Sequence, residues 1–485
     1  MIQYILIGHE LQNDVQTMVQ VFYPNKHYTR VEEIPETGIT IVSNTEEHGV
    51  VAASVFVDGK IVRKWSVEYE GEPTEKDMRC YVKRTLYELL ELETGISPQW
   101  GILTGVRPAK IVTELLKEGK SEEGCLHYLT GRYLVTMEKA ELSIQVAKAE
   151  AHILTETPAN QIGLYIGIPF CPTRCLYCSF TAYPLEQYKD RVDEYLDAMF
   201  KEMDYVSEYI KQTGQVLQSI YIGGGTPTSL TEVQLARLLK KVQGVFGSPV
   251  SEYTVEAGRP DTITKEKLQL MKTYHVNRIS INPQTMNQKT LDAVGRKHTV
   301  DDICRVFEEA RACGHDNINM DLILGLPNET PADVEYTMQQ LEKLAPESVT
   351  VHTLAVKRAS RLKEEFDQHT LTSLGNMEEM IEISSEYAEK MGMEPYYMYR
   401  QKNMVGNFEN VGYCIPGKES VYNVQIMEER QTILAVGAGA STKTVDRETN
   451  HIDRVYNVKS VEDYIARIDE MIERKKDGLP EGGNV

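Results

Sequence analysis

The stretch that decides the fold is LYIGIPFCPTRCLYCSF, residues 164–180. Its apolar first half predicts a buried β-strand, and its second half predicts a tight loop that carries Cys171, Cys175 and Cys178. The spacing C-x3-C-x2-C indicates metal or redox chemistry. Three thiolates can hold three irons of a [4Fe–4S] cube and leave the fourth iron open to a small ligand. The alternative is a zinc site that takes its fourth ligand from elsewhere in the chain.

Strand and helix patterns alternate downstream of this loop, with about six βα units in roughly 230 residues. This rhythm predicts an α/β fold with a parallel sheet, either an incomplete barrel or an open doubly wound sheet. In both cases, ligands bind at the carboxyl ends of the strands. The expected strands are 164–168, 219–225, 252–257, 277–281, 317–325 and 348–354. The expected helices are 188–211, 231–246, 264–274, 300–313, 331–344 and 377–391.

The regions on either side of these units have a different character. The pattern of residues 1–155 predicts an α+β domain. Its strands form a meander that turns at Asp58-Gly59, and its helices are expected near 75–93, 109–118 and 137–154. Pro158 and Asn160 break the helical pattern, so a boundary is expected near 156–162. We therefore expect an N-terminal domain at 1–155, a barrel at 160–360 and a C-terminal subdomain at 361–485.

Composition and charge exclude several classes of protein. The 485 residues are 41% hydrophobic, and the net charge of −20 argues against binding to nucleic acid or anionic membranes. The N-terminus lacks the pattern of a secretory signal, and no apolar run is long enough to span a membrane. Eight cysteines, three of them clustered, are typical of a metal or redox protein of the reducing cytoplasm.

The cysteine loop, with Tyr177 before its last cysteine, resembles the radical S-adenosylmethionine (SAM) superfamily. The string YIGIPFC at 165–171 resembles the oxygen-independent coproporphyrinogen III oxidase family, and GILTGVRP at 101–108 resembles its HemZ-type branch of coproporphyrinogen dehydrogenases. The resemblance covers the barrel most specifically, at about 160–360. It implies an incomplete parallel (β/α)6 barrel whose cofactors are a [4Fe–4S] cluster on the three cysteines and SAM.

The same resemblance implies which residues at the strand ends contact SAM. The glycine-rich end of the second strand, with Gly224, Gly225 and Thr226, meets the methionyl amino group, because glycines let the backbone approach a ligand closely. Glu256 accepts hydrogen bonds from the ribose hydroxyls. The other implied contacts are Gln284, Asp321 and Arg296, the last of which pairs with the SAM carboxylate.

Two tyrosines flank the cysteine loop. By the resemblance, Tyr165 contacts SAM, and Tyr177, together with Ala355, contacts a possible second SAM. Both tyrosines are therefore candidates for the catalytic centre, and packing of the aromatic rings against the cluster is the alternative.

The substrate that the resemblance implies is coproporphyrinogen III, whose four propionates need cations in this acidic chain. Arg358 and Arg361 follow the sixth strand, and Arg400 follows a tyrosine-rich segment. Because ligands bind at strand ends, we expect these three arginines on substrate carboxylates. A solvated basic face is the alternative.

The implied reaction begins when a reduced flavodoxin or ferredoxin-type donor reduces the cluster and SAM is cleaved to a 5′-deoxyadenosyl radical. The radical removes a hydrogen from a propionate, carbon dioxide leaves and a vinyl remains; two rounds give protoporphyrinogen IX. This chain has Gly167 where oxidases of the family have a histidine, and Ser179-Phe180 without the further cysteine after Cys178. A haem chaperone on the same scaffold, and a tetrapyrrole methylase or ring-opening enzyme, therefore remain open.

Overall fold

The computed structural model describes residues 1–24, 26–105, 107–180, 182–247, 250–355, 360–364, 372–401, 407–447, 449 and 451–480. Within these residues, the chain forms two compact units. The first unit comprises Met1–Ala147 and Tyr399–Glu409, and the second comprises Lys148–Met398 and Asn410–Val485.

The first unit contains, among its described residues, a five-stranded sheet with the order β2-β1-β3-β4-β5. β1 is parallel to β2 and β3, whereas β3, β4 and β5 form the predicted antiparallel meander. Asp58 and Gly59 turn the last hairpin with φ of 49° and 72°, the positive values that a type I′ turn requires. The strands are β1 (Ile2–Ile7), β2 (Tyr28–Arg30), β3 (Ile39–Asn44), β4 (Val50–Val57) and β5 (Lys60–Glu68).

Helices pack on this sheet through apolar faces. Thr74 and Asp77 form a capping box at the start of α2, which contacts β4 and β5. The helices are α1 (Gln12–Phe22), α2 (Glu75–Thr94), α3 (Pro108–Lys117), α4 (Glu122–Tyr133) and α5 (Met137–Glu156), and the part of α5 from Lys148 onward belongs to the second unit. The predicted helices at 75–93, 109–118 and 137–154 are confirmed, and α4 and β2 are additional.

The second unit contains, within the described chain, an eleven-stranded sheet. Its central strands β6, β9, β10, β11, β12 and β13 are parallel neighbours, which confirms the six predicted strands. The full order is β14 (Glu394–Tyr399), β15 (Asn410–Cys414), β13 (Ser348–Thr353), β12 (Ile318–Leu324), β11 (Arg278–Ser280), β10 (Glu252–Glu256), β9 (Val216–Gly224), β6 (Gln161–Ile168), β16 (Ile433–Val436), β17 (Ser441–Val445) and β18 (Ile452–Tyr456).

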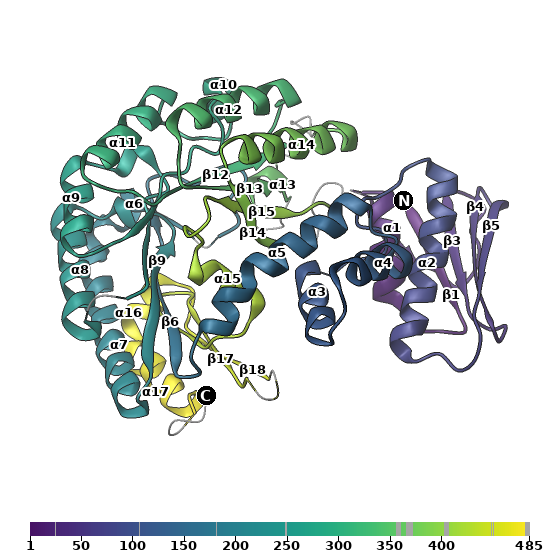
Figure 1. The fold of residues 1–485 in the computed structure, drawn as a ribbon, viewed down its shortest axis with the longest axis horizontal. Coiled ribbons are helices and arrows are strands. Elements are labelled where there is room, and N and C mark those ends of the chain that lie inside the picture. Colours follow the sequence, from purple (N-terminus) through teal and green to yellow (C-terminus); the bar gives the residue numbers. More distant parts are fainter. Residues whose placement is uncertain are drawn as a thin grey trace. The chain divides into compact units, whose positions relative to one another are not determined.

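Amphipathic helices follow these parallel strands and line the outer face of the sheet (Figure 1). α8, α11 and α12 each begin with a capping box. In each box the side chain of the N-cap threonine accepts a hydrogen bond from the backbone N–H of the third helical residue, and the side chain of that residue accepts one from the backbone N–H of the threonine. The long helices are α7 (Val192–Thr213), α8 (Glu232–Phe246), α9 (Lys265–Thr273), α11 (Val300–Ala312), α12 (Pro331–Leu344) and α14 (Leu374–Lys390). Their positions agree with the predicted helices to within a few residues.

Shorter elements complete the second unit. They are the strands β7 (Phe170–Cys171) and β8 (Tyr183–Pro184), the helices α6 (Leu185–Tyr188), α10 (Gln288–Ala293), α13 (Arg361–Glu364), α15 (Val421–Glu428), α16 (Val461–Ala466) and α17 (Ile468–Gly478), and the 3₁₀ turns η1 (Lys189–Arg191), η2 (Pro227–Ser229) and η3 (Pro260–Thr262).

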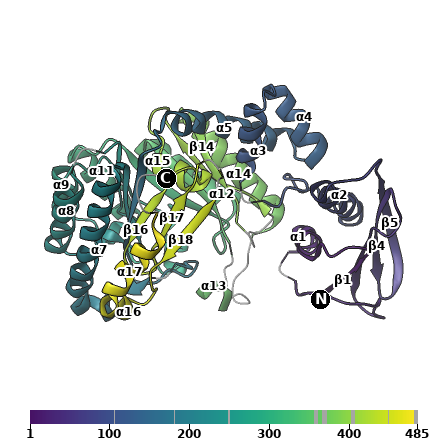
Figure 2. The same ribbon diagram turned by 90° about the horizontal axis from the view of Figure 1, so that it is seen from below.

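The C-terminal region continues the barrel sheet and does not form a separate compact unit as we had expected from 361 onward. β15 is antiparallel to β13, and β16 is parallel to β6, so both edges of the six-stranded sheet are extended. α16 and α17 contact α7 (Figure 2). The physical reason is that the edge strands β13 and β6 have backbone N–H and C=O groups that need partners.

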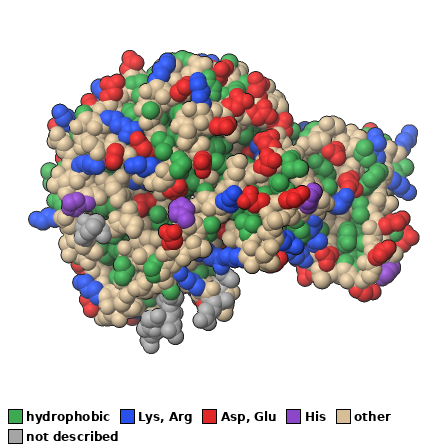
Figure 3. All heavy atoms as spheres, viewed as in Figure 1, with side chains coloured by type: hydrophobic (Ala, Val, Ile, Leu, Met, Phe, Trp, Pro, Cys, Tyr) green, Lys and Arg blue, Asp and Glu red, His purple; other side chains and the backbone are tan. Residues whose placement is uncertain are grey.

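Acidic and basic side chains are interspersed over the face shown in Figure 3. None of the helices in the described part of the chain is long and apolar enough to cross a membrane.

Candidate functional site

The cysteine loop leaves the carboxyl end of β6, where sequence analysis placed it. Cys175 is buried, whereas Cys171 and Cys178 are partly exposed. The Cys171 Sγ lies 3.4 Å from the Oγ1 of Thr226, at the end of β9. Among the described residues, no three His, Cys, Asp or Glu side chains converge as the ligands of a single ion would.

The backbone of the loop is held from both sides. Leu176 N–H donates to Val294 O at 3.0 Å, and Leu176 O accepts from Leu362 N–H at 2.9 Å. The ring of Tyr177 packs against a buried apolar cluster of Leu176, Val294, Ile323, Leu326, Leu354 and Leu362. This packing supports the cysteine loop and partly buries the side chain of Tyr177.

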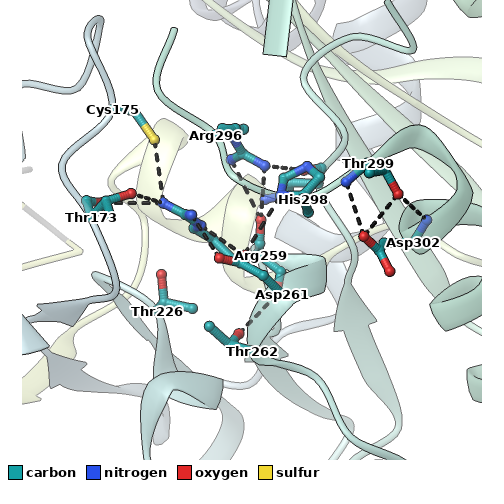
Figure 4. A network of polar contacts seen from close by, with 12 residues as sticks. Thr173, Cys175, Thr226, Arg259, Asp261, Thr262, Arg296, His298, Thr299 and Asp302 are labelled. Atoms are coloured by element: carbon teal, nitrogen blue, oxygen red, sulfur yellow. Dashed lines mark hydrogen bonds and ion pairs between the residues drawn. The ribbon is translucent and has the colours of Figure 1, made fainter. Parts of the chain in front are cut away.

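A buried guanidinium, which sequence analysis did not single out, also contacts the loop. Arg259 Nη1 donates to Thr173 Oγ1 at 2.8 Å, to Thr173 O at 3.2 Å and to Cys175 Sγ at 3.8 Å. Its other edge forms a bidentate pair with Asp261 at 3.0 and 2.8 Å. Asp261 Oδ1 lies 3.6 Å from Nδ1 of the buried His298 (Figure 4).

The environment of the thiols fits a negatively charged cluster. Burial raises the pKa of Cys171 to about 11 and also raises the pKa of Cys178. A buried thiolate therefore needs a nearby positive charge, either a metal or a side chain. Arg259 contacts Cys175, and the buried Arg296 contacts Tyr177, so two cations lie beside the cysteine loop.

The glycine-rich end of β9 fits against the backbone of the cysteine loop. A Cβ on Gly225 would lie 2.6 Å from Phe170 O, and a Cβ on Gly223 would lie 2.7 Å from the Tyr221 ring. Gly225 N–H donates to Ile168 O, and Thr226 N–H donates to Phe170 O. These glycines therefore let the end of β9 lie close to the backbone of the cysteine loop.

Glu256 ends β10 and faces the interior of the barrel. Its Oε1 accepts from Tyr221 Oη at 2.6 Å, and its Oε2 accepts from Gly224 N–H at 3.2 Å. The rings of Tyr165, Tyr221 and Tyr422 stack beside it, and the closest pair, Tyr221 and Tyr422, has centroids 4.2 Å apart. Tyr165 therefore lies on the same wall as Glu256 and the glycine-rich end.

Gln284 and Asp321 are brought together by neighbouring strands. Gln284 N–H donates to Asp321 O. The backbone of Gln284 has a φ of +67°, a value that residues other than glycine rarely adopt. The Asp321 carboxylate accepts from Asn282 at 2.7 Å and from Asn319 at 2.6 Å, with His352 Nε2 at 3.9 Å. Although burial acts to raise the pKa of Asp321, these donors hold it below its ordinary value.

The Arg296 guanidinium is buried among backbone carbonyls. It donates to Asn282 O at 2.6 Å, to Gly258 O at 3.4 Å and to Tyr177 Oη at 3.2 Å. Arg296 therefore joins the Tyr177 side of the cysteine loop to the ends of β10 and β11. Its pairing with a SAM carboxylate stays a prediction.

The residues predicted for the substrate end have different surroundings. Ala355 lies two residues after the end of β13, and Arg361 begins α13 and is exposed. Arg358 lies outside the described residues.

Arg400 does not have the surroundings of a substrate ligand. It is buried in the first unit, donates to Leu103 O at 2.5 Å and to Asn407 O at 2.7 Å, and stacks on Trp100 at 4.9 Å. Burial lowers its pKa to about 10. Its guanidinium is occupied by the protein's own groups, so we no longer assign it to a propionate. The sequence placed it near the basic segment, but the chain at 399–409 joins the first unit.

A partial parallel barrel with three cysteines after its first strand defines the radical SAM class of proteins. Residues 165–341 match the family described as the Radical SAM superfamily. In a solved structure, the Escherichia coli coproporphyrinogen III oxidase HemN, described as a radical SAM enzyme, shares this fold. The TM-score is 0.51, with 22% identity over 67% of this chain and 73% of that one.

Two curated relatives indicate the family within this superfamily. The Bacillus subtilis oxygen-independent coproporphyrinogen-III oxidase-like protein HemZ is 38% identical over 96% of this chain and 95% of its own length. The heme chaperone HemW of the same organism is 36% identical over 58% of this chain and 72% of its own. The chain belongs to the oxygen-independent coproporphyrinogen III oxidase-like family of radical SAM proteins. Proteins of this superfamily use a [4Fe–4S] cluster and SAM.

Proposed function

We propose that this protein converts two propionate side chains of coproporphyrinogen III to vinyl groups, which yields protoporphyrinogen IX without oxygen. In each round, a propionate loses a hydrogen atom and carbon dioxide, a carbon–carbon double bond forms, and the remaining electron passes to an acceptor. The observation that carries the proposal is the 38% identity, over nearly the whole of both chains, to a relative named as coproporphyrinogen-III oxidase-like.

The chain's own residues would divide the work as follows. Cys171, Cys175 and Cys178 hold three irons of the cluster. When bound, the cluster and SAM supply the one-electron chemistry that removes a hydrogen atom from the substrate. We propose that the SAM contacts are Tyr165, Gly224, Gly225, Thr226, Glu256, Gln284, Arg296 and Asp321. Tyr165 and Asp321 lie within β6 and β12, Arg296 follows α10, and the others lie at the carboxyl ends of β9 and β10 or in the loops after β9 and β11.

The two carboxylates that we propose as SAM contacts, Asp321 and Glu256, differ in the direction in which their pKa values are shifted. Asp321 keeps its charge because its pKa is lowered, whereas burial raises the pKa of Glu256 to about 7. We propose that Glu256 binds the ribose hydroxyls and that Tyr177 and Ala355 border a second SAM. Two titratable groups with separated pKa values are typical of functional sites.

The substrate's carboxylates require cations in a chain of net charge −20. Arg361, exposed at the start of α13, is the described cation that we propose for this role. We also propose Arg358, predicted from the sequence, as a second contact with the substrate's carboxylates. A reduced flavodoxin or a ferredoxin-type protein is the proposed electron donor.

A haem chaperone is the second candidate. It is favoured by the relative named as a heme chaperone and by the C-x-F ending of the cysteine loop, where Phe180 is 68% exposed.

The test is an anaerobic assay of the reconstituted protein with dithionite, SAM and coproporphyrinogen III, followed by mass spectrometry. The proposal expects the mass loss of one carbon dioxide and two hydrogens for each propionate converted to a vinyl, at two positions, with one 5′-deoxyadenosine per vinyl. Stoichiometric haem binding without SAM cleavage would support the chaperone instead. A methylated or ring-opened tetrapyrrole would support the third class of enzyme.

A further inference from the structure

One buried cation reaches the cysteine loop directly. Arg259 is only 3% exposed, and its Nη1 donates to Cys175 Sγ and to both oxygens of Thr173. Thr173 lies between the first two cysteines, so a single guanidinium nitrogen contacts the loop on both sides of Arg174. Thr173 Oγ1 also donates to Gly295 O at 3.3 Å, which ties this contact to the loop before α11.

The guanidinium is itself held in place. Asp261 accepts from Nε and Nη2 of Arg259, and the short turn η3 brings the carboxylate back toward the arginine. Buried His298 lies on the far side of Asp261 (Figure 4). A planar fork that binds a carboxylate on one edge can present its other edge in a fixed direction, which a lysine cannot do.

The charge of Arg259 has a consequence for a cluster on this loop. A cube held by three thiolates carries net negative charge, and reduction makes that charge more negative. A buried cation in a medium of low polarity stabilises the more negative state, and hydrogen bonds to ligand sulfur act in the same direction. Both terms favour reduction.

We propose that Arg259, oriented by Asp261, is a positioning residue for the cluster: it fixes Cys175 for iron binding and raises the cluster's reduction potential. This role concerns the cluster that the superfamily uses and does not depend on the identity of the tetrapyrrole. It follows that an external donor can reduce the cluster at a potential that the bare thiolate site would not allow.

The experiment compares Arg259→Gln with Arg259→Lys in the full chain after anaerobic reconstitution. Iron per chain and the cluster's midpoint potential, followed by electron paramagnetic resonance during a dithionite titration, are the readouts. We expect Arg259→Gln to bind less iron and to shift the midpoint to a more negative value. Arg259→Lys should keep the midpoint nearer to that of the parent but bind less iron, because it loses the fork.

Arg278→Gln is the matched control, because Arg278 is equally buried and donates to Asn317, Ser348 and Lys418 without contacting the cysteine loop. It should destabilise the barrel and leave the midpoint unchanged. Full iron content and an unchanged midpoint in Arg259→Gln would overturn the proposal. So would an equal shift in Arg278→Gln, since the effect would then be one of general stability. If Arg259→Gln does not fold, an unchanged iron content in Arg259→Lys contradicts the positioning role.

Discussion

Tyr221 on β9 donates a 2.6 Å hydrogen bond to Oε1 of Glu256 on β10. Burial is the largest cause that raises the pKa of Glu256, and the charge of Asp321 adds to it. With the opposing bonds from Tyr221 and Gly224 included, the pKa is raised to about 7. Glu256 is therefore protonated below neutral pH and ionised above it. Asp321, with its lowered pKa, stays ionised throughout this range.

This titration predicts that SAM binds more tightly as the pH rises through 7. A ribose hydroxyl donates best to a carboxylate, so protonation of Glu256 opposes binding. If only the ionised form binds, affinity should fall about tenfold between pH 8 and pH 6. Equilibrium dialysis of the anaerobic, reconstituted protein with SAM measures this change. Glu256→Gln should bind weakly with a flat profile, and the same slope in that variant would contradict the assignment.

Removal of one cysteine tests the cluster. Cys175→Ala leaves two thiolates, too few to hold the cube with one open iron, so iron binding and SAM cleavage should disappear together. Iron analysis and the yield of 5′-deoxyadenosine measure the two effects. Cys313→Ala, at the end of α11 and outside the cysteine loop, should change neither. SAM cleavage that survives Cys175→Ala would refute the cluster assignment.

The strained backbone at Gln284 gives a prediction that separates stability from binding. At a φ of +67°, alanine is strained by about 1 kcal/mol, and glycine is not. We therefore expect Gln284→Gly to be about 1 kcal/mol more stable than Gln284→Ala in urea unfolding. Both variants lack the side chain proposed to contact SAM, so their SAM affinities should fall equally. Retention of full affinity by either variant would remove Gln284 from the SAM site.

Arg400 and Arg361 should respond in opposite ways to truncation. Arg400→Ala removes three bonds to backbone carbonyls and the stacking on Trp100, so it should destabilise the protein by about 2–4 kcal/mol. Arg361→Ala, at an exposed position, should destabilise the protein less than Arg400→Ala does and should weaken binding of coproporphyrinogen III. Chemical denaturation and substrate titration measure the pair. A loss of substrate affinity in Arg400→Ala alone would reverse our interpretation.

Local patterns were enough for the elements of the barrel. Each parallel strand is an apolar run followed by an amphipathic helix, and both signals are contained within short segments. α4 escaped prediction because Gly124 and Gly131 interrupt its weak helical pattern, and β2 escaped because it has three residues. The separate C-terminal subdomain was expected from the aromatic segment that precedes Arg400 and from the charged helical pattern near 460–476. Nothing local shows that β15 and β16 pair with the edges of the barrel.

The sequence by itself determined the class of chemistry, because the three cysteines of the loop lie within eight consecutive residues and their spacing needs no folding to be read. Tertiary structure alone decided which side chains support that loop. Arg259 is 86 residues from Thr173 and 84 from Cys175, so their contact arises only when β9 pairs with both β6 and β10 in the folded sheet. It likewise decided that Arg400 is buried on Trp100, since hydrogen bonds and burial between distant segments leave no local pattern.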